Sequence, residues 1–208
     1  MTTRNIPTLN LQNKNYPMPL STPTIQTERL LLRPFAESDL DDFFECCRNP
    51  NLGNNAGWKP HEAREESEEA LHSVFMNQEG IWGIELKETN RIIGSVGIIP
   101  DPKRENPASR MLGYWLKETH WGKGFMSEAV TAVLEYGFNT LHLKLISANC
   151  YPHNIRSRRL LTSKNFVYEG ILHEAEQTYD GRIYDHLCFY LPKNNYPAHP
   201  DKNTELNR

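Results

Sequence analysis

Two glycines stand where the sequence predicts that a strand passes into a helix. Residues 111–116 have the apolar and aromatic pattern of a strand, and a helix is expected to open at Phe125 or Met126. Between them, Gly122 and Gly124 let the backbone approach a ligand closely and turn its N–H groups outward. The positive end of the helix dipole adds to the attraction for an anion. The junction is therefore predicted to bind an anion such as a phosphate.

This pattern does not decide the matter alone, because a strand, two glycines and a helix also describe an ordinary tight turn. The loop matches neither of two common nucleotide fingerprints. It has no Gly-x-Gly-x-x-Gly, and its Gly-Lys pair is not followed by Ser or Thr. The rest of the chain must distinguish a turn from a site.

Composition limits the classes of protein that remain. The chain of 208 residues suits one domain, and 23 Lys and Arg against 26 Asp and Glu give no basic field for nucleic acid. Its apolar runs are short, and residues 1–12 lack the blocks of a signal peptide, so we expect a cytoplasmic protein with no membrane partner. The cysteines, Cys46, Cys47, Cys150 and Cys188, show no Cys-x-x-Cys spacing, which predicts reduced thiols and no metal site.

Strand and helix periodicities alternate over residues 25–191, which we expect to form one domain. The flanking segments 1–24 and 192–208 are rich in Asn, Pro and Thr and are predicted to be flexible. Ser38 is expected to cap the first helix, and residues 49–59 to form a loop. The predicted helices are 38–47, 60–77, 125–138 and 154–164, and the predicted strands are 27–35, 80–88, 91–100, 111–116, 143–150, 166–176 and 186–191. This order predicts an α+β domain around one sheet.

Several segments in this order resemble the GNAT superfamily of N-acetyltransferases, and within it the ribosomal-protein N-acetyltransferase-like branch. The resemblance spans residues 25–191 and is most specific at residues 116–129, at Asn-Ile-Arg-Ser (154–157), at residues 164–170 and at Thr-Glu-Arg-Leu-Leu-Leu-Arg-Pro (27–34). It implies a single mixed, mostly antiparallel sheet flanked by helices, with two strands splayed around acetyl-CoA. It also implies transfer of an acetyl group to an amine, without a metal.

The resemblance assigns the glycine junction to the acetyl donor. It implies that residues 121–126 grip the pyrophosphate of coenzyme A through backbone N–H groups, and that Asn154 hydrogen-bonds the pantetheine arm. The family usually has Gln or Arg where this chain has Thr119, which removes one side-chain contact but leaves the backbone cradle. The expected donor-binding residues are Leu116, Trp121, Gly122, Lys123, Gly124, Phe125, Met126, Asn154 and Ser157.

Acetyl transfer to an amine requires a base for the ammonium and an acid for the departing thiolate. Ser157 follows Asn154 by three residues, so both project from the same helical turn. In the resembling branch this serine contacts the coenzyme A sulfur, which makes it the candidate acid, although it could instead satisfy local backbone groups. Glu176 matches an acidic residue near the acceptor and is the candidate base, with an exposed strand carboxylate as the alternative.

Three further residues are candidates at the reaction centre. Cys150 matches a cysteine of the branch and could carry an acetyl group, but a reactive thiolate needs a cationic partner that the sequence does not show. Direct transfer in a ternary complex is therefore the simpler expectation. Trp58 and Tyr114 are expected to bind the acceptor, although aromatic residues in these positions also serve as core packing.

The acceptor stays open at this level. The resemblance favours a protein N-terminus, and by analogy a homodimer. A small amine, namely a polyamine, an amino sugar or an amino acid, is one alternative. A non-catalytic module that binds acyl-CoA is another.

Overall fold

The computed structural model describes residues 22–76 and 78–196. Most of the two segments predicted to be flexible, residues 1–21 and 197–208, lies outside the described residues. At both ends the packed chain reaches slightly beyond residues 25 and 191. The carbonyl of Pro23 accepts a hydrogen bond from Trp82 Nε1 at 2.7 Å, and Lys193 Nζ donates to the Phe138 carbonyl at 2.7 Å.

Eight strands form one sheet in the order β1-β2-β3-β4-β5-β6-β8-β7. Only β5 and β6 pair in parallel, and every other neighbouring pair is antiparallel. The predicted mixed, mostly antiparallel sheet is therefore confirmed. The strands are β1 (Ile25–Gln26), β2 (Leu30–Arg33), β3 (Ile81–Leu86), β4 (Arg91–Ile99), β5 (Ser109–Leu116), β6 (Leu145–Cys150), β7 (Val167–Gln177) and β8 (Ile183–Pro192).

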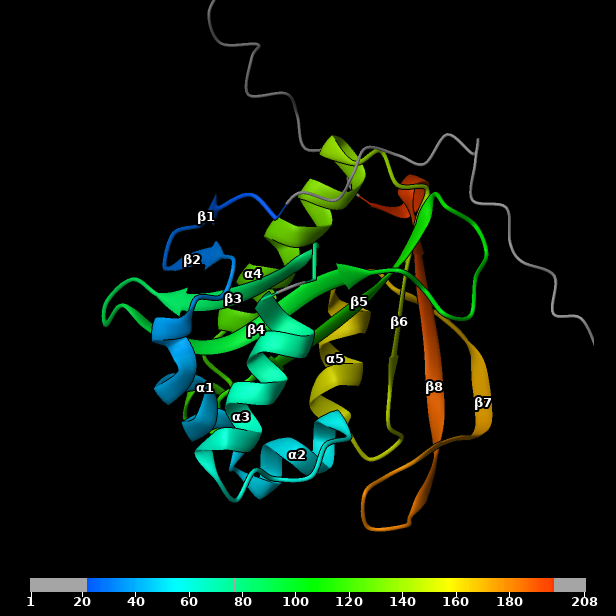
Figure 1. Cartoon of the computed structure of the whole chain (residues 1–208). Coiled ribbons are helices and arrows are strands. Elements are labelled where there is room, and N and C mark those ends of the chain that lie inside the picture. The colour runs from blue at the N-terminus through cyan, green and yellow to red at the C-terminus, as the bar shows by residue number, and fades with distance from the viewer. Residues whose placement is uncertain (1–21, 77, 197–208) are drawn as a thin grey trace, which may run out of the picture.

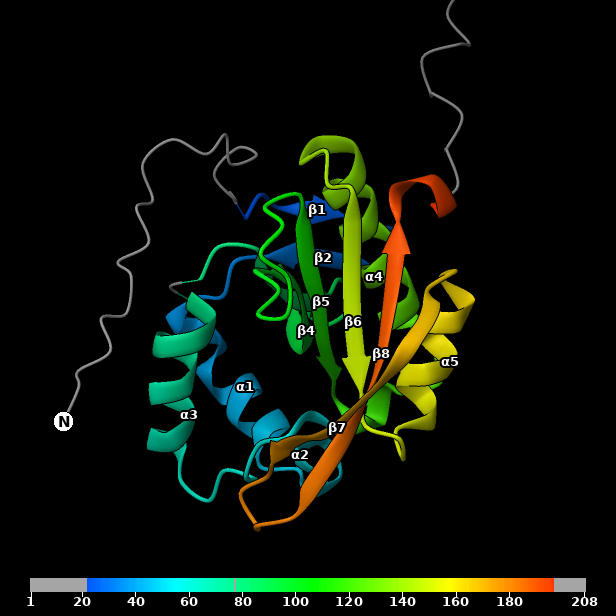
Figure 2. The ribbon, with the colours of Figure 1, turned by 90° about the vertical axis from the view of Figure 1, so that its right-hand side faces the viewer.

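Helices cover the sheet unevenly. α4 (Phe125–Glu135) and α5 (Ile155–Ser163) lie on one face, and α1 (Leu40–Cys47), α2 (Pro50–Ala56) and α3 (Arg64–Ala70) cover the other face along β3 to β5 (Figure 1). Each layer buries its own apolar core. Turned by 90°, the same ribbon shows β6 and β8 without a helix in front of them (Figure 2).

The central helix forms as its apolar stripe predicts. Ala129, Val130, Val133 and Leu134 are at most 1% exposed, and Phe138 is buried in the π-helical turn that follows. This stripe packs against the sheet, so α4 crosses from β5 to the parallel strand β6 with its N-terminus fixed at the end of β5.

Residues 49–59 were predicted to be a loop, and this prediction is wrong because they contain α2. The Asn49 side chain accepts hydrogen bonds from the N–H groups of Asn51 and Leu52, Pro50 occupies the first helical turn, and Gly57 ends the helix with φ 88°. These are ordinary start and stop signals of a helix. The Asn and Gly content, which is unfavourable inside a helix, conceals them.

Two helix starts were also misplaced. The helix expected from residue 60 begins at Arg64 and continues into a π-helical turn, Leu71–Met76. Ser38 does not cap the first helix. The Asp39 carboxylate accepts the Ala36 N–H at 2.8 Å instead, and a 3-10 turn, Glu37–Asp39, precedes α1.

The two parallel strands separate at one end of the sheet. β5 and β6 pair only from Ser109–Leu145 to Leu112–Ala148. Beyond this point β5 stays with β4 as far as Leu116, and β6 stays with β8 as far as Cys150. The predicted splay is confirmed, because each strand follows its antiparallel neighbour away from the other.

Candidate active site

A cavity of about 450 Å³ lies beyond the point where β5 and β6 separate. The N-terminus of α4 and the first turn of α5 form its walls, and the C-terminal end of α2 lies beside it. Of the residues expected to bind the donor, it is lined by Leu116, Trp121, Gly122, Gly124, Phe125, Met126, Asn154 and Ser157. The fold thus brings together in one cavity residues that are up to 41 positions apart in the sequence.

The loop before α4 has the geometry of an anion cradle. Gly124 is the N-cap residue of α4, with φ 83° in the left-handed region that disfavours side chains. The first N–H groups of a helix have no partner within the helix, and Phe125, Met126 and Ser127, which carry these groups in α4, all line the cavity. A Cβ placed on Gly122 would meet no atom within 4 Å, so this glycine leaves open space beside the loop.

Arg29, from the turn before β2, fixes this loop from behind. Its Nη1 donates to the Lys123 carbonyl at 3.0 Å, its Nε bonds Glu128 at 2.7 Å, and its guanidinium stacks on Phe125 at 4.4 Å. Burial raises the pKa of Glu128, but hydrogen bonds from Thr27 and Arg29 outweigh it and lower the pKa below its ordinary value. Arg29 was missed as a site residue, although it lies in the conspicuous segment 27–34.

Lys123 is not among the residues that line the cavity, and its expected contribution of charge to donor binding stays a prediction, with a solvent-facing side chain as the alternative. Cationic groups reach the cavity from elsewhere, as Arg156 and Arg159 of α5, and the His120 side chain also lines it. Arg156 stacks on the Trp121 ring at 4.3 Å. Burial, followed by the charges of Lys123 and Lys117, lowers the pKa of His120, so this imidazole is neutral at pH 7.

Two hydroxyl groups meet at the inner end of this cavity. Tyr114 Oη and Ser157 Oγ lie 2.7 Å apart, and burial raises the pKa of Tyr114, so the phenol keeps its proton at neutral pH. Asn154 positions the serine, because its Oδ1 caps α5 by accepting the Ser157 N–H at 3.1 Å. Its Nδ2 donates to the Asn55 carbonyl at 3.3 Å and so ties α5 to α2.

A second cavity, of about 270 Å³, adjoins the first on the other side of Tyr114. Tyr114 and Trp115 line both cavities, and Trp58 and Glu176 line only the second. The Trp58 ring also packs edge-on against Trp115 at 5.9 Å, so it serves the cavity wall and the core together. The structure therefore brings Glu176 to the far side of the two hydroxyl groups.

Glu176 is held by two neighbouring side chains, those of His186 and Tyr151. His186 Nε2 lies 2.9 Å from Glu176 Oε2, and the Tyr151 hydroxyl also bonds this carboxylate. The Glu176 side chain is 38% exposed, which leaves room for an incoming amine. Gly57 must lack a side chain here, because a Cβ would lie 2.5 Å from the Tyr151 hydroxyl and 2.7 Å from Glu176 Oε1.

The protonation of His186 follows from its other neighbours. Lys103 Nζ, which can only donate, lies 3.2 Å from Asn149 Oδ1. The Asn149 amide N–H₂ therefore faces His186 Nδ1, at 3.2 Å, and donates to it. The proton of a neutral imidazole then sits on Nε2 and points at Glu176. The hydrogen-bonded series Lys103–Asn149–His186–Glu176 fixes this tautomer.

Cys150 lines the second cavity but is poorly suited to act as a nucleophile. Burial raises the pKa of its thiol, which the nearby Ser157 hydroxyl and Arg158 only partly oppose. Thiolate is therefore scarce at neutral pH.

We expect Cys150→Ala to keep turnover within about fivefold of the parent, because no covalent step through the thiol is needed. Mass spectrometry after acid quenching of enzyme mixed with acetyl-CoA should find no acetyl group on this cysteine. Cys188→Ala is the matched control. An acetyl-thioester on Cys150 that forms at the rate of turnover would contradict this expectation.

A parallel β5-α4-β6 unit with an anion cradle at the helix start, and a carboxylate across the gap, is the arrangement of an acyl-CoA-dependent N-acyltransferase. The acetyltransferase (GNAT) domain matches residues 29–167. The chain belongs to this family and is an N-acetyltransferase.

Three similar proteins illustrate the relationship. The uncharacterized N-acetyltransferase p20 of Bacillus licheniformis is 33% identical over 83% of this chain and 98% of its own length. The ribosomal-protein-serine acetyltransferase of Escherichia coli is 25% identical over 79% and 92%. The crystal structure of spermidine N-acetyltransferase from Vibrio cholerae, in complex with CoA and spermine, superposes with a TM-score of 0.68 at 26% identity, over 82% of this chain and 99% of that one.

Two features are absent from the part of the chain that the structure describes. Across residues 22–76 and 78–196, no helix is long and apolar enough to cross a membrane. In the same part of the chain, no group of three or more His, Cys, Asp or Glu side chains could hold a metal ion.

Proposed function

We propose that this N-acetyltransferase moves the acetyl group of acetyl-CoA directly to the α-amine of a peptide N-terminus, in a ternary complex. One observation carries the proposal. The two cavities share Tyr114, whose hydroxyl bonds Ser157 in the first cavity, and the loop before α4 lines the first cavity while Glu176 lines the second. A donor and an acceptor bound in these cavities would meet at the hydroxyl pair.

The first cavity fits the chemistry of coenzyme A. The N–H groups at the start of α4 suit the pyrophosphate, and each hydrogen bond to a charged oxygen contributes about 1.5–3 kcal/mol. Arg156 and Arg159 add positive charge along the same wall. The thioester would then lie in the gap between the strands, close to Ser157.

The groups around the junction match the two proton transfers. On the acceptor side, Glu176 takes a proton from the incoming ammonium, while His186 Nε2–H and the Tyr151 hydroxyl hold the carboxylate in place. On the donor side, the Ser157 and Tyr114 hydroxyls supply a proton or hydrogen bond to the departing thiolate. Together these groups allow transfer without a covalent enzyme intermediate.

The lining of the second cavity favours a peptide N-terminus over the small amines. Among the described residues that line it, Glu176 is the only acidic one, and none is Lys or Arg. A polyamine would present several cations to one carboxylate. A free amino acid would bring a carboxylate with no cation to meet it. A peptide N-terminus brings one ammonium followed by neutral amides.

A panel of amines tests the acceptor class. Peptides with free N-termini, polyamines, amino sugars and amino acids would be compared by release of the coenzyme A thiol. We expect peptides to give the highest kcat/KM. Calorimetric binding of coenzyme A with no acetylation of any amine would instead favour a non-catalytic module.

We expect Glu176→Gln to lower turnover about 100-fold at pH 7, because an amide cannot remove a proton from the ammonium. An N-terminal amine has an ordinary pKa of about 8, so below that pH most of the acceptor arrives protonated. The deficit should therefore be largest at low pH and shrink as the pH rises towards 9. The pH dependence of kcat/KM is the measurement, with Glu174→Gln as the matched control. Parallel profiles for parent and variant would remove Glu176 as the base.

A further inference from the structure

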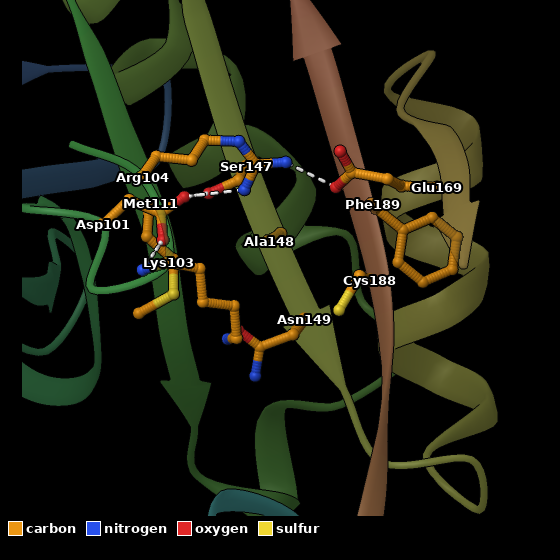
Figure 3. A pocket seen from close by; sticks show the side chains of 10 residues that line it. All are labelled: Asp101, Lys103, Arg104, Met111, Ser147, Ala148, Asn149, Glu169, Cys188 and Phe189. Carbon is orange, nitrogen blue, oxygen red and sulfur yellow. Dashed lines mark hydrogen bonds and ion pairs between the residues drawn. The ribbon is translucent and has the colours of Figure 1, made fainter. Parts of the chain in front are cut away.

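A third cavity, of about 280 Å³, lies on the helix-free face of β6 and β8. Figure 3 shows its lining, with Asp101, Lys103 and Arg104 reaching over the sheet from the segment between β4 and β5. Met111 and Asn149 line both this cavity and the second one, where the acceptor amine is proposed to bind. The two cavities are therefore neighbours along the sheet. We call the third cavity the outer groove.

Most charges around the outer groove are already paired. Arg104 forms ion pairs with Asp101 and Glu169, and the Ser147 hydroxyl donates to the same aspartate (Figure 3). Asp101 is only 6% exposed. Burial raises its pKa, but the hydrogen bonds from Ser147, the Lys103 N–H and Arg104 lower it overall, so it stays ionised. These groups form a rigid wall of the groove. Because their charges are already paired, they attract a charged ligand only weakly.

The ammonium of Lys103 differs from its neighbours. Its side chain is exposed, and its hydrogen-bond partner is the neutral Asn149 Oδ1, at 3.2 Å. Within the described residues it forms no ion pair. Because Asn149 lines both cavities, this hydrogen bond holds the positive charge at the boundary between them.

From this placement we propose that the outer groove receives the residues that follow the N-terminal residue of the acceptor, and that Lys103 selects a carboxylate side chain there. The inference rests on the proposed function, since it extends the acceptor peptide from Glu176 into the next cavity. It names the substrate class more closely, as a peptide with an acidic residue shortly after its free N-terminus.

The distances permit this assignment. The Lys103 ammonium and the Glu176 carboxylate are linked by three hydrogen bonds of 3.2, 3.2 and 2.9 Å through Asn149 and His186. With the amide and imidazole between them, the span is at most about 14 Å, the length of about four extended residues. An α-amine at Glu176 thus places the second or third side chain of the acceptor within reach of Lys103.

The test uses matched peptides and charge variants. The peptides share an N-terminal serine and an amidated C-terminus, and carry either Glu or Gln at position 2 or 3. For the parent we expect kcat/KM to be about fivefold higher for Glu than for Gln, the upper range for an exposed ion pair. Raised salt should reduce this ratio.

Variants of Lys103 separate its charge from its shape. Lys103→Met should bring the ratio close to one, and Lys103→Glu should invert it. Lys144→Glu makes the same charge change at an exposed site near the start of β6 and should leave the fivefold ratio unchanged. Circular dichroism checks that each variant is folded.

Four outcomes would overturn the inference. A parent ratio near one, or a ratio that Lys103→Glu does not change, removes Lys103 as a selector while leaving peptide acetylation intact. A ratio near one together with an altered sedimentation coefficient for Lys103→Glu would assign the groove to contact with a second copy of the chain. If no peptide is acetylated at all, the proposed function itself fails, and the inference fails with it.

Discussion

Gly124→Val should weaken acetyl-CoA binding on the order of 100-fold, because the loss of one or two charge-assisted hydrogen bonds has that effect. The residue has φ 83°, where a β-branched side chain is strongly disfavoured. A Cβ would also lie 3.3 Å from Nη2 of Arg29, the residue whose Nη1 holds this loop by donating to the Lys123 carbonyl. We expect the loop to rearrange in order to relieve this strain, and the first N–H groups of α4 then turn away from the pyrophosphate. Isothermal titration with acetyl-CoA measures the change.

Gly181→Val is the matched control for backbone strain. Gly181 has φ 82° in the turn between β7 and β8, with no atom within 4 Å of an added Cβ. This variant should lose stability, as Gly124→Val does, but keep its affinity for acetyl-CoA. Unchanged affinity in Gly124→Val would refute the assignment of the cradle.

Ser157→Ala should lower kcat about 100-fold, the range for loss of a positioned acid, and change the Kd of coenzyme A less than about threefold. The substitution keeps the backbone bond from the Ser157 N–H to Asn154, so the start of α5 stays formed. It removes only the hydroxyl that meets Tyr114 at 2.7 Å. Single-turnover kinetics and titration with coenzyme A separate the two effects.

Tyr114→Phe and the double variant complete this test. If the two hydroxyls act as one unit, the double variant should lose little more activity than the worse single variant. Ser163→Ala, at the exposed end of the same helix, should behave like the parent. Equal losses in kcat and in coenzyme A affinity would reduce Ser157 to a binding residue.

The fold was predictable where its helices and strands have clear local sequence patterns. The apolar stripe of α4 and the alternation of strands and helices along the chain specify the α+β sheet. α2 was missed because its signals are individually weak, and because it is held by contacts made elsewhere. Asn49 and Asn51, for example, bond Glu118, which lies far away in the sequence.

By itself, the sequence predicted the segments that line the first cavity, where we propose that the donor binds. A glycine cradle, a helix start and a cap followed by Ser157 are local features, since each depends on residues within a few positions of one another. The acceptor side depends on tertiary structure, although the sequence had already singled out Glu176, Trp58 and Tyr114 as candidates. Glu176, His186 and Asn149 lie on three different strands, and Gly57 and Lys103 belong to connections between elements. Only the order of the strands and their splay bring these residues together. Sheet pairing places distant segments of the chain side by side, and no local sequence pattern shows which segments will pair.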